Sequence, residues 1–263
     1  MKIKLIKDGM GRRELELLET AACVKNGKEA FSTLDHMVRT SQIYASLAIK
    51  YPEILKIADE NGSTIAHTMT YVSPTSAIEL MESHPELLPL ADKNGRTVAH
   101  AIAIMPIHAM KLINAHPELL PLADKNGVTV AHAAAAASGK TQMTITQLHP
   151  ELLPLADIKG ITVAHIVVAY SREATMEIIK NHPELLMCKR NGFYTVAYDA
   201  CKFEEAVLAM LECRRFDVFK GTHGKALIET AMSYHPKLKE NVMLQNILAE
   251  LYKEEMLDIL RKQ

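Results

Sequence analysis

The sequence has no tryptophan, and its 8 tyrosines and 5 phenylalanines together make up only 5% of its 263 residues. Apolar residues still account for 48% of the chain, as in ordinary folded proteins, so the composition argues against disorder. No apolar run is long enough for a signal peptide or for a membrane-spanning helix of about 20 residues. We therefore expect a cytoplasmic protein, or one delivered to a host cytosol by a signal-independent route.

Cysteine is also scarce, which bears on disulfides and on zinc. The chain has four cysteines, and their spacing matches neither a CxxC motif nor a zinc finger: Cys23, Cys188, Cys201 and Cys213. We predict that these thiols are reduced and mostly buried.

Neither sign of charge is in excess, because 30 basic and 31 acidic side chains leave a formal net charge of −1. The chain therefore gives no general electrostatic reason to bind nucleic acid or an anionic membrane. Signatures of common enzyme classes are missing as well. The segment GTHGK (221–225) is not a phosphate-binding loop, because its glycines are too close together and no Ser or Thr follows the lysine. We predict no enzymatic activity and no cofactor.

The sequence does contain a repeat. The stretch HPELLPLADKNGRTVAH (84–100) returns with few changes at 116–132 and 149–165, and weaker copies flank these three at 51–67 and 182–198. The prolines and threonines of these copies recur at intervals of 32 or 33 residues. A fixed period of this length is typical of a solenoid of stacked units, and it takes precedence over a segment-by-segment interpretation.

Each repeat has the same expected order of elements. In the second copy, Asp92–Gly95 predicts a turn, and Thr97 is a good cap for a first helix over 98–105. A second helix is expected over 106–115, because a proline suits the first helical position. In the preceding repeat, Ser73 is the expected cap of this second helix. The PELL segment that follows predicts a short helical turn.

This plan of turn, helix and helix, with Thr-x-x-His opening the first helix, resembles the ankyrin repeat. The resemblance covers about residues 51–203 and is carried by Asp92, Gly95, Thr97, His100 and their equivalents. Thr-Val-Ala-His replaces the family's Thr-Pro-Leu-His, and the helical character of the HPELLPLAD segment leaves two alternatives open: the family's β-hairpin finger, or a plain loop or helical turn in its place. The resemblance implies an L-shaped stack whose concave face binds other proteins.

We accordingly predict an all-α, ankyrin-like helical-repeat solenoid with divergent capping regions at both ends. Residues 1–50 are expected to form a divergent N-terminal capping repeat, and residues 51–203 the ankyrin-like repeats. Residues 204–263 are expected to form a degenerate repeat and a C-terminal capping helix. Solenoids need such atypical ends, because a terminal unit has no neighbour to cover it.

The divergent regions give their own helix predictions. Helices are expected over 14–23, 35–50 and 201–213, with an Asn-Gly turn near 25–34. A degenerate sixth repeat is expected at 223–232. The amphipathic segment 241–260 is interpreted as a capping helix, with a dimerisation helix as the alternative. We expect a monomer, or a dimer that forms through this segment.

Histidines form two columns, one at the Thr-x-x-His position and one before each PEL segment: His67, His100, His132 and His165, and His84, His116, His149 and His182. Members of a column lie about 8–10 Å apart, which is the packing distance of helices. Two ligands of one zinc ion lie about 3–4 Å apart, so a column cannot close around one ion. We predict no metal site. The resemblance implies that the first column bonds the threonine and the turn backbone, whereas the second column can bond the last carbonyls of a helix.

The variable positions of the repeats are the candidates for partner binding. They lie just before the cap threonine, within the turns, and at the end of the first helix. The partner-binding candidates are Tyr71, Arg96, Ile104, Met105, Val128, Ile158, Ile161, Tyr170, Phe193, Tyr194 and Phe203. They become more apolar toward the C-terminus, and we predict a binding centre at Tyr170, Ile161, Phe193 and Tyr194. Packing between tightly stacked helices is the alternative interpretation.

The sequence thus favours a non-enzymatic module that binds a protein target, which it recruits or blocks, through its concave face and turn edges. An effector enzyme with active residues near His223, Lys225 and Glu229 is the alternative, as is a self-assembling structural subunit.

Overall fold

The computed structural model describes residues 11–24, 28–72 and 74–261, and the chain divides into two compact units, residues 1–137 and 138–263. Helices dominate both units. The described helices of unit 1 are α1 (Arg12–Val24), α2 (Lys28–Thr40), α3 (Gln42–Ile49), α4 (Pro52–Leu55), α5 (Ile65–Val72), α6 (Pro74–Ser83), α7 (Val98–Ala103), α8 (Pro106–Ala115) and α9 (Val130–Ala137). Those of unit 2 are α10 (Gly139–Leu148), α11 (Val163–Tyr170), α12 (Arg172–Asn181), α13 (Val196–Ala200), α14 (Glu204–Glu212), α15 (Gly221–Tyr234) and α16 (Val242–Arg261).

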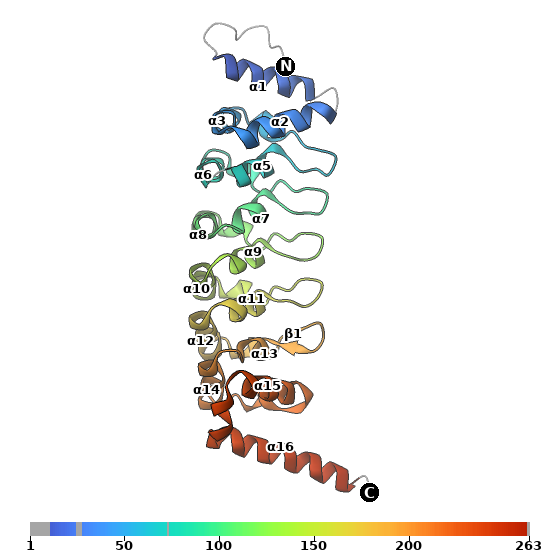
Figure 1. The fold of residues 1–263 in the computed structure, drawn as a ribbon, viewed down its shortest axis with the longest axis vertical. Coiled ribbons are helices and arrows are strands. Elements are labelled where there is room, and N and C mark those ends of the chain that lie inside the picture. The colour runs from blue at the N-terminus through green and yellow to red at the C-terminus, as the bar shows by residue number, and fades with distance from the viewer. Residues whose placement is uncertain (1–10, 25–27, 73, 262–263) are drawn as a thin grey trace. The chain divides into compact units, whose positions relative to one another are not determined.

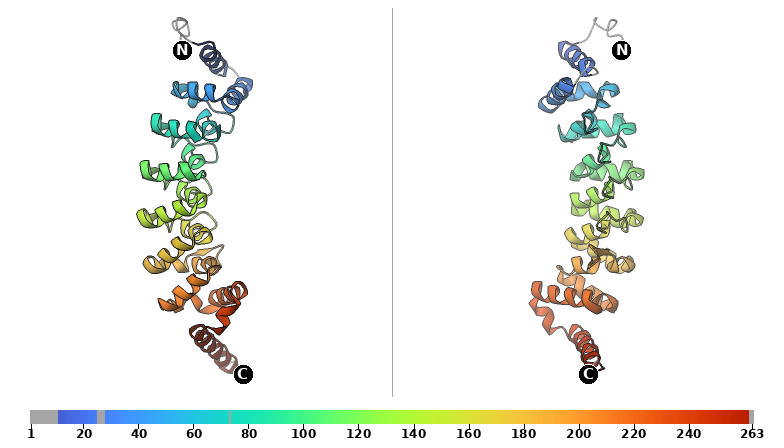
Figure 2. Two further views of the ribbon diagram at one scale, coloured as in Figure 1. Left: turned by 60° about the vertical axis from the view of Figure 1, so that its left-hand side comes forward. Right: turned by 90° about the vertical axis from the view of Figure 1, so that its right-hand side faces the viewer.

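Helix pairs stack within each unit, and the turns that precede the first helices lie on one side of the pairs (Figure 1). The turned views show the same stacking of pairs (Figure 2). The fold class is therefore the predicted one, an all-α repeat solenoid with ankyrin-like repeats. None of the helices in the described part of the chain is long and apolar enough to cross a membrane.

Caps and prolines set the helix boundaries inside a repeat. The Thr97 backbone is extended, and its hydroxyl accepts a hydrogen bond from the His100 N–H at 3.3 Å, so Thr97 caps α7 as predicted. Helix α7 ends at Ala103, two residues before the predicted end. Met105 precedes a proline, which disfavours helical geometry there, and Met105 becomes the extended cap of α8. The predicted Ser73 cap lies outside the described residues.

The PEL segments form the expected short helical turns. Most of them are 3-10 helices, at Pro85–Leu87, Pro117–Leu119, Pro150–Leu152 and Pro183–Met187, with two further 3-10 helices at Phe216–Phe219 and Pro236–Glu240. Their leucines lie in the core between helix pairs: Leu88 and Leu120 are completely buried, together with Val98, Ile102 and Leu112 of the helices. Apolar burial of this kind is the main force that holds stacked repeats together.

The turn itself is built from backbone and one aspartate. The Asp92 carboxylate accepts hydrogen bonds from the N–H groups of Asn94 and Arg96 at 2.8 and 2.9 Å. The Gly95 N–H donates to the Asp92 carbonyl, and Gly95 has a φ of +80°, a conformation that glycine adopts without steric cost. Ala91 and Thr97 then face each other in an antiparallel bridge.

Equivalent bridges decide between the two alternatives for the turn, in favour of a short hairpin. They occur at Ala58–Thr64, Ala123–Thr129 and Ala156–Thr162, and in the fifth repeat they extend to a two-stranded sheet of β1 (Lys189–Arg190) and β2 (Tyr194–Thr195). The helical PEL segment and the hairpin coexist because the chain enters the bridge only after the 3-10 helix has ended.

The first histidine column links neighbouring repeats in unit 1, as its structural interpretation predicts. The His100 Nδ1 accepts a hydrogen bond from the Thr97 N–H at 3.1 Å, so the proton of the neutral ring is on Nε2. The Nε2–H then donates to the Val128 carbonyl of the next turn at 3.0 Å, and His67 makes the same contact with the Arg96 carbonyl at 3.1 Å. Burial lowers the pKa of His67 and His100.

The second histidine column bonds helix ends, but across repeats. His84 Nε2 donates to the carbonyl of Ile49, the last residue of α3, at 2.6 Å. Its Nδ1 lies 3.2 Å from the carboxylate of Glu86. The same His-Glu contact recurs in His116–Glu118, His149–Glu151 and His182–Glu184, at 3.3, 3.4 and 3.7 Å.

Several predictions for the divergent regions need correction. The helix expected over 35–50 is two helices, α2 and α3, because the backbone is extended at Ser41. The helix expected over 201–213 begins only at Glu204. The sixth repeat predicted at 223–232 lies inside the single helix α15. The Asn-Gly turn expected near residue 26 lies outside the described residues.

The predicted helices 14–23 and 241–260 correspond to α1 and α16. The expectation of mostly buried cysteines is wrong. All four thiols are free, but only Cys201 is buried, Cys188 is half-buried, and Cys23 and Cys213 are exposed. Burial raises the pKa of Cys201 to about 12.

Candidate protein-binding surface

The turn of the fifth repeat differs from the others in sequence and in geometry. In the other repeats the turn glycine is two residues before the cap threonine. In the fifth repeat Gly192, which follows Asn191, is three residues before Thr195. Both residues have positive φ, at 51° and 71°, and the Phe193 N–H donates to the Arg190 carbonyl at 3.1 Å. Asn-Gly favours a tight turn of this kind, and the three residues 191–193 connect the paired strands. The local sequence therefore explains why β1 and β2 form in this repeat.

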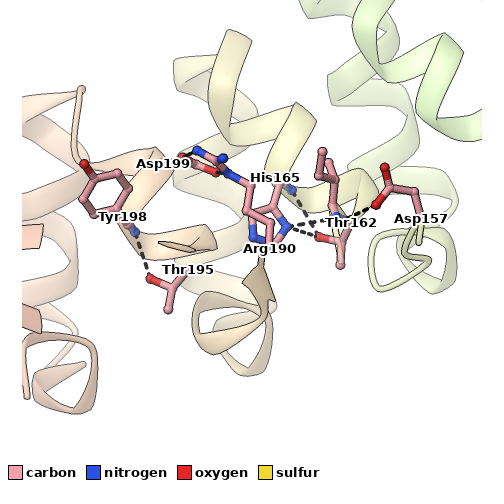
Figure 3. A network of polar contacts seen from close by, with 8 residues as sticks. Asp157, Thr162, His165, Arg190, Thr195, Tyr198 and Asp199 are labelled. Atoms are coloured by element: carbon pink, nitrogen blue, oxygen red, sulfur yellow. Dashed lines mark hydrogen bonds and ion pairs between the residues drawn. The ribbon is translucent and has the colours of Figure 1, made fainter. Parts of the chain in front are cut away.

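Arg190 replaces the aspartate that supports the turn in the preceding repeats, and its side chain contacts α13 (Figure 3). Its Nε and Nη2 donate to the two carboxylate oxygens of Asp199, both at 2.7 Å. The guanidinium carbon also lies 4.9 Å from the centre of the Tyr194 ring. Arg190 thus fixes the hairpin to the helix that follows it.

Aromatic rings gather on this hairpin. The Phe193 ring lies 5.1 Å from the Tyr194 ring and 4.7 Å from the His223 ring, and the Tyr194 ring lies 4.8 Å from that of Tyr198. We call Phe193, Tyr194, Tyr198 and His223 the turn-edge cluster. Phe193 and Tyr194 keep 38% and 36% of their surface exposed, although aromatic side chains of this size are usually more deeply buried.

Tyr198 takes the place of the histidine in the Thr-x-x-His motif. Its N–H donates to the Thr195 hydroxyl at 3.1 Å, which preserves the cap of α13 (Figure 3). Its ring packs on Tyr194, and its hydroxyl accepts from the Thr230 hydroxyl of α15 at 3.3 Å. The element after this repeat is α15 rather than another hairpin, so no turn carbonyl follows for an imidazole to bond. The tyrosine therefore suits the place where the regular repeats end.

A second group of exposed rings lies at the ends of the first helices. Tyr170, the last residue of α11, is 70% exposed. The Lys202 Nζ lies 5.6 Å from the Tyr170 ring centre and 4.9 Å from that of Phe203. We call Tyr170, Lys202 and Phe203 the helix-end cluster. Burial lowers the pKa of Lys202.

The structure divides the predicted binding centre of unit 2 between these two groups. Phe193 and Tyr194 belong to the turn-edge cluster, and Ile158 (71% exposed) and half-buried Ile161 lie in the preceding turn. Tyr170 is at the other end of α11, about 12 Å away along an eight-residue helix. The candidates therefore form two patches. The predicted binding residues do not include Lys202, because its contact with Tyr170 joins residues of different repeats.

In unit 1 the candidates divide in the same way. Tyr71, Ile104 and Met105 lie at or just after the ends of the first helices and are 59%, 43% and 44% exposed. Arg96 is exposed and Val128 is half-buried, both in turns. Ile107, at the start of α8, is 71% exposed and was not predicted from the sequence. The apolar exposure of unit 1 is thus concentrated where the two helices of a pair meet.

The residues of the enzyme alternative all lie on α15. His223 packs on Phe193, whereas Lys225 and Glu229 are exposed along α15. Within the described ranges, no group of three or more His, Cys, Asp or Glu side chains could hold a metal ion.

Among known proteins, similar chains are found only among solved structures. No protein-family model matches the chain, and no curated protein matches it at a significant level. One similar structure is the ankyrin repeat domain of Bcl-3, a unique member of the IkappaB protein family. It is 16% identical over 80% of this chain and 87% of that one, with a TM-score of 0.42. Another is a chain in the complex of the predatory endopeptidase Bd0816 from Bdellovibrio bacteriovorus with the immunity protein Bd3460. It is 17% identical over 80% of this chain and 96% of that one, with a TM-score of 0.40.

Proposed function

We propose that this chain is a non-enzymatic protein-binding module that recruits or blocks a protein target. Its contact surface in unit 2 consists of the turn-edge cluster, Ile158 of the neighbouring turn, and the helix-end cluster.

The observation that carries the proposal is that the turns do not need their exposed side chains. In the turns of Asp92, Asp124 and Asp157, the same carboxylate oxygen accepts the same two backbone N–H groups at 2.8 to 3.0 Å. These bonds are unchanged although the second turn residue is Lys93, Lys125 or Ile158. An isoleucine that is 71% exposed at this position contributes little to the turn, and water does not favour it there.

The exposed rings of the fifth hairpin extend this argument. Tyrosine and phenylalanine bury large areas at interfaces with little loss of side-chain entropy, and they often dominate binding energy. Phe193 and Tyr194 are held by neighbouring rings and by Arg190, so a partner would meet a surface that is already ordered. These contacts support a rigid binding surface.

Affinity capture from the native host tests the proposal. The full chain is immobilised, captured proteins are identified, and the dissociation constant of the main partner is measured. We expect the double substitution Phe193→Ser and Tyr194→Ser to weaken binding by at least about 2 kcal/mol. The matched control is Leu148→Ser, because Leu148 is 63% exposed in the same unit but lies outside both clusters. Equal affinity of the double variant and the wild type, with both folded, would refute the proposed surface.

A further inference from the structure

The helix-end cluster contains a cation, Lys202, that forms no ion pair with a carboxylate of the described residues. In the described part of the chain, none of the ion pairs of unit 2 includes Lys202. Its Nζ lies against the rings of Tyr170 and Phe203, at 5.6 and 4.9 Å from their centres. Such rings attract a cation but carry no formal charge to neutralise it.

Two of the charged groups nearby are already paired. Both carboxylate oxygens of Asp199 accept hydrogen bonds from Arg190. Arg172, at the start of α12, pairs with Glu205 at 3.2 Å. Lys202 has neither of these two carboxylates as an ion-pair partner, so its positive charge can meet an incoming group.

Lys202 is also held in place. The His235 Nε2–H donates to the Lys202 carbonyl at 2.9 Å, and the Phe203 N–H donates to the Ala200 carbonyl at 3.1 Å. These bonds hold the backbone on both sides, and the contacts of the Nζ with the Tyr170 and Phe203 rings place the amino group. A prearranged site loses less entropy on binding.

The surroundings disfavour an isolated ammonium group. Burial lowers the pKa of Lys202, and Asp199 compensates only in part. A carboxylate brought against the Nζ would stabilise the charged form further, and the pKa would rise. The exposed face of Tyr170 beside it is suited to an apolar side chain.

We infer that the helix-end cluster binds an Asp or Glu side chain of a protein segment, next to an aliphatic or aromatic residue that packs on Tyr170. The inference rests on the proposed protein-binding function and names the chemistry of the partner. A single ammonium between two rings suits one carboxylate, whereas phosphorylated segments are recognised by clusters of arginine.

Peptide display provides the first test. Short random peptides, fused through their C-termini so that they carry no terminal carboxylate, are selected against the full chain and against Lys202→Met. We expect the wild type to enrich peptides with Asp or Glu beside an aliphatic or aromatic residue, and Lys202→Met to lose this enrichment. Enrichment that is the same on both proteins, or absent from the wild type, would overturn the inference.

Synthetic peptides from the selection, amidated at the C-terminus, provide the quantitative test. Replacing the acidic residue by its amide should weaken binding to the wild type about tenfold and should not change binding to Lys202→Met. Lys202→Arg, which keeps the charge, should retain the preference for the acid. Nuclear magnetic resonance of the Lys202 side chain should show its pKa rising when the acidic peptide binds. Equal affinity of the acid and amide peptides for the wild type contradicts the inference.

The two proposals fail in different ways. If Lys202→Met captures the native partner as well as the wild type does, and Phe193→Ser with Tyr194→Ser does not, the carboxylate site is wrong and the binding function stands. If none of these changes affects capture, the carboxylate site and the proposed contact surface are both wrong, and the partner binds elsewhere on the chain.

Discussion

Arg190 and Asp199 form a two-pronged ion pair, with two N–O distances of 2.7 Å, that ties the fifth hairpin to α13. At the equivalent positions, the second and third copies of the repeat have aspartate and alanine: Asp92 with Ala101, and Asp124 with Ala133. In the fifth repeat the carboxylate is thus on the helix, at Asp199, and no longer in the turn. The turn no longer needs it, because Asn191-Gly192 forms the hairpin without side-chain support.

The first prediction concerns this pair. Asp199→Ala should lower the free energy of unfolding by about 1–3 kcal/mol, because it leaves a partly buried arginine without its acceptor. Denaturation in urea, followed by circular dichroism, measures the loss. Glu205→Ala is the control, because it breaks the Arg172 pair, whose side chains are 57% and 47% exposed, and should cost under about 1 kcal/mol. Equal costs for the two variants would show that the Arg190 pair behaves as an ordinary surface contact.

The second prediction concerns the glycine of a regular turn. Gly95→Val should destabilise the protein by about 1–3 kcal/mol, because a branched residue is strained at a φ of +80°. A Cβ at this position would also lie 3.1 Å from the Lys125 nitrogen of the next repeat. The denaturation midpoint is the measurement.

Gly139→Ala is the matched control for that change. Gly139 is the first residue of α10, its φ is not in the left-handed region, and the nearest atom to a new Cβ is 3.9 Å away. Alanine favours the helix, so this variant should be neutral or slightly more stable. A Gly95→Val variant that is as stable as Gly139→Ala would contradict the strain argument.

The repeated part of the fold could be predicted from the sequence because the same residues recur at the same positions. Thr97, Gly95 and Pro106 each act locally, as cap, turn residue and first helical residue, so a single copy contains the necessary information. Whether the turns form hairpins stays open from the sequence, because the helical PEL segment precedes each turn directly. The shifted Asn191-Gly192 pair was the signal for β1 and β2.

The ends and the site were harder to predict, because they depend on contacts between segments distant in sequence. Nothing local in the sequence required the break between α2 and α3 at Ser41. Tyr170 and Tyr194 both occupy variable positions of the repeat. Tyr170, however, is at the C-terminal end of the eight-residue helix α11, whereas Tyr194 is in a turn that precedes a first helix. Lys202 is a candidate because its amino group lies against the ring of Tyr170, which is 32 positions earlier in the chain. No sequence pattern within one repeat indicates that contact.

The last prediction concerns pH and the buried histidines. Burial lowers the pKa of His67, His100 and His165 below the ordinary value of about 6.5. The unfolded chain therefore binds more protons than the folded chain in the window below about pH 6.5, and stability must fall as the pH falls through that window. The geometry gives the reason, because a proton on Nδ1 of His100 would face the Thr97 N–H, which is also a donor.

Urea denaturation at pH 7.5 and pH 5.5 measures this effect, and a single variant isolates it. Every group whose pKa differs between the folded and the unfolded chain adds to the pH dependence of stability. The informative quantity is therefore the difference in pH slope between the wild type and His100→Gln. Near His100, Asp124 and Asp92 favour the protonated ring and Arg96 opposes it, but burial is the largest effect. We expect the wild type to lose more stability between the two pH values than the variant does. A variant with the same or a steeper slope would show that His100 accepts a proton in the folded protein as readily as in the unfolded chain.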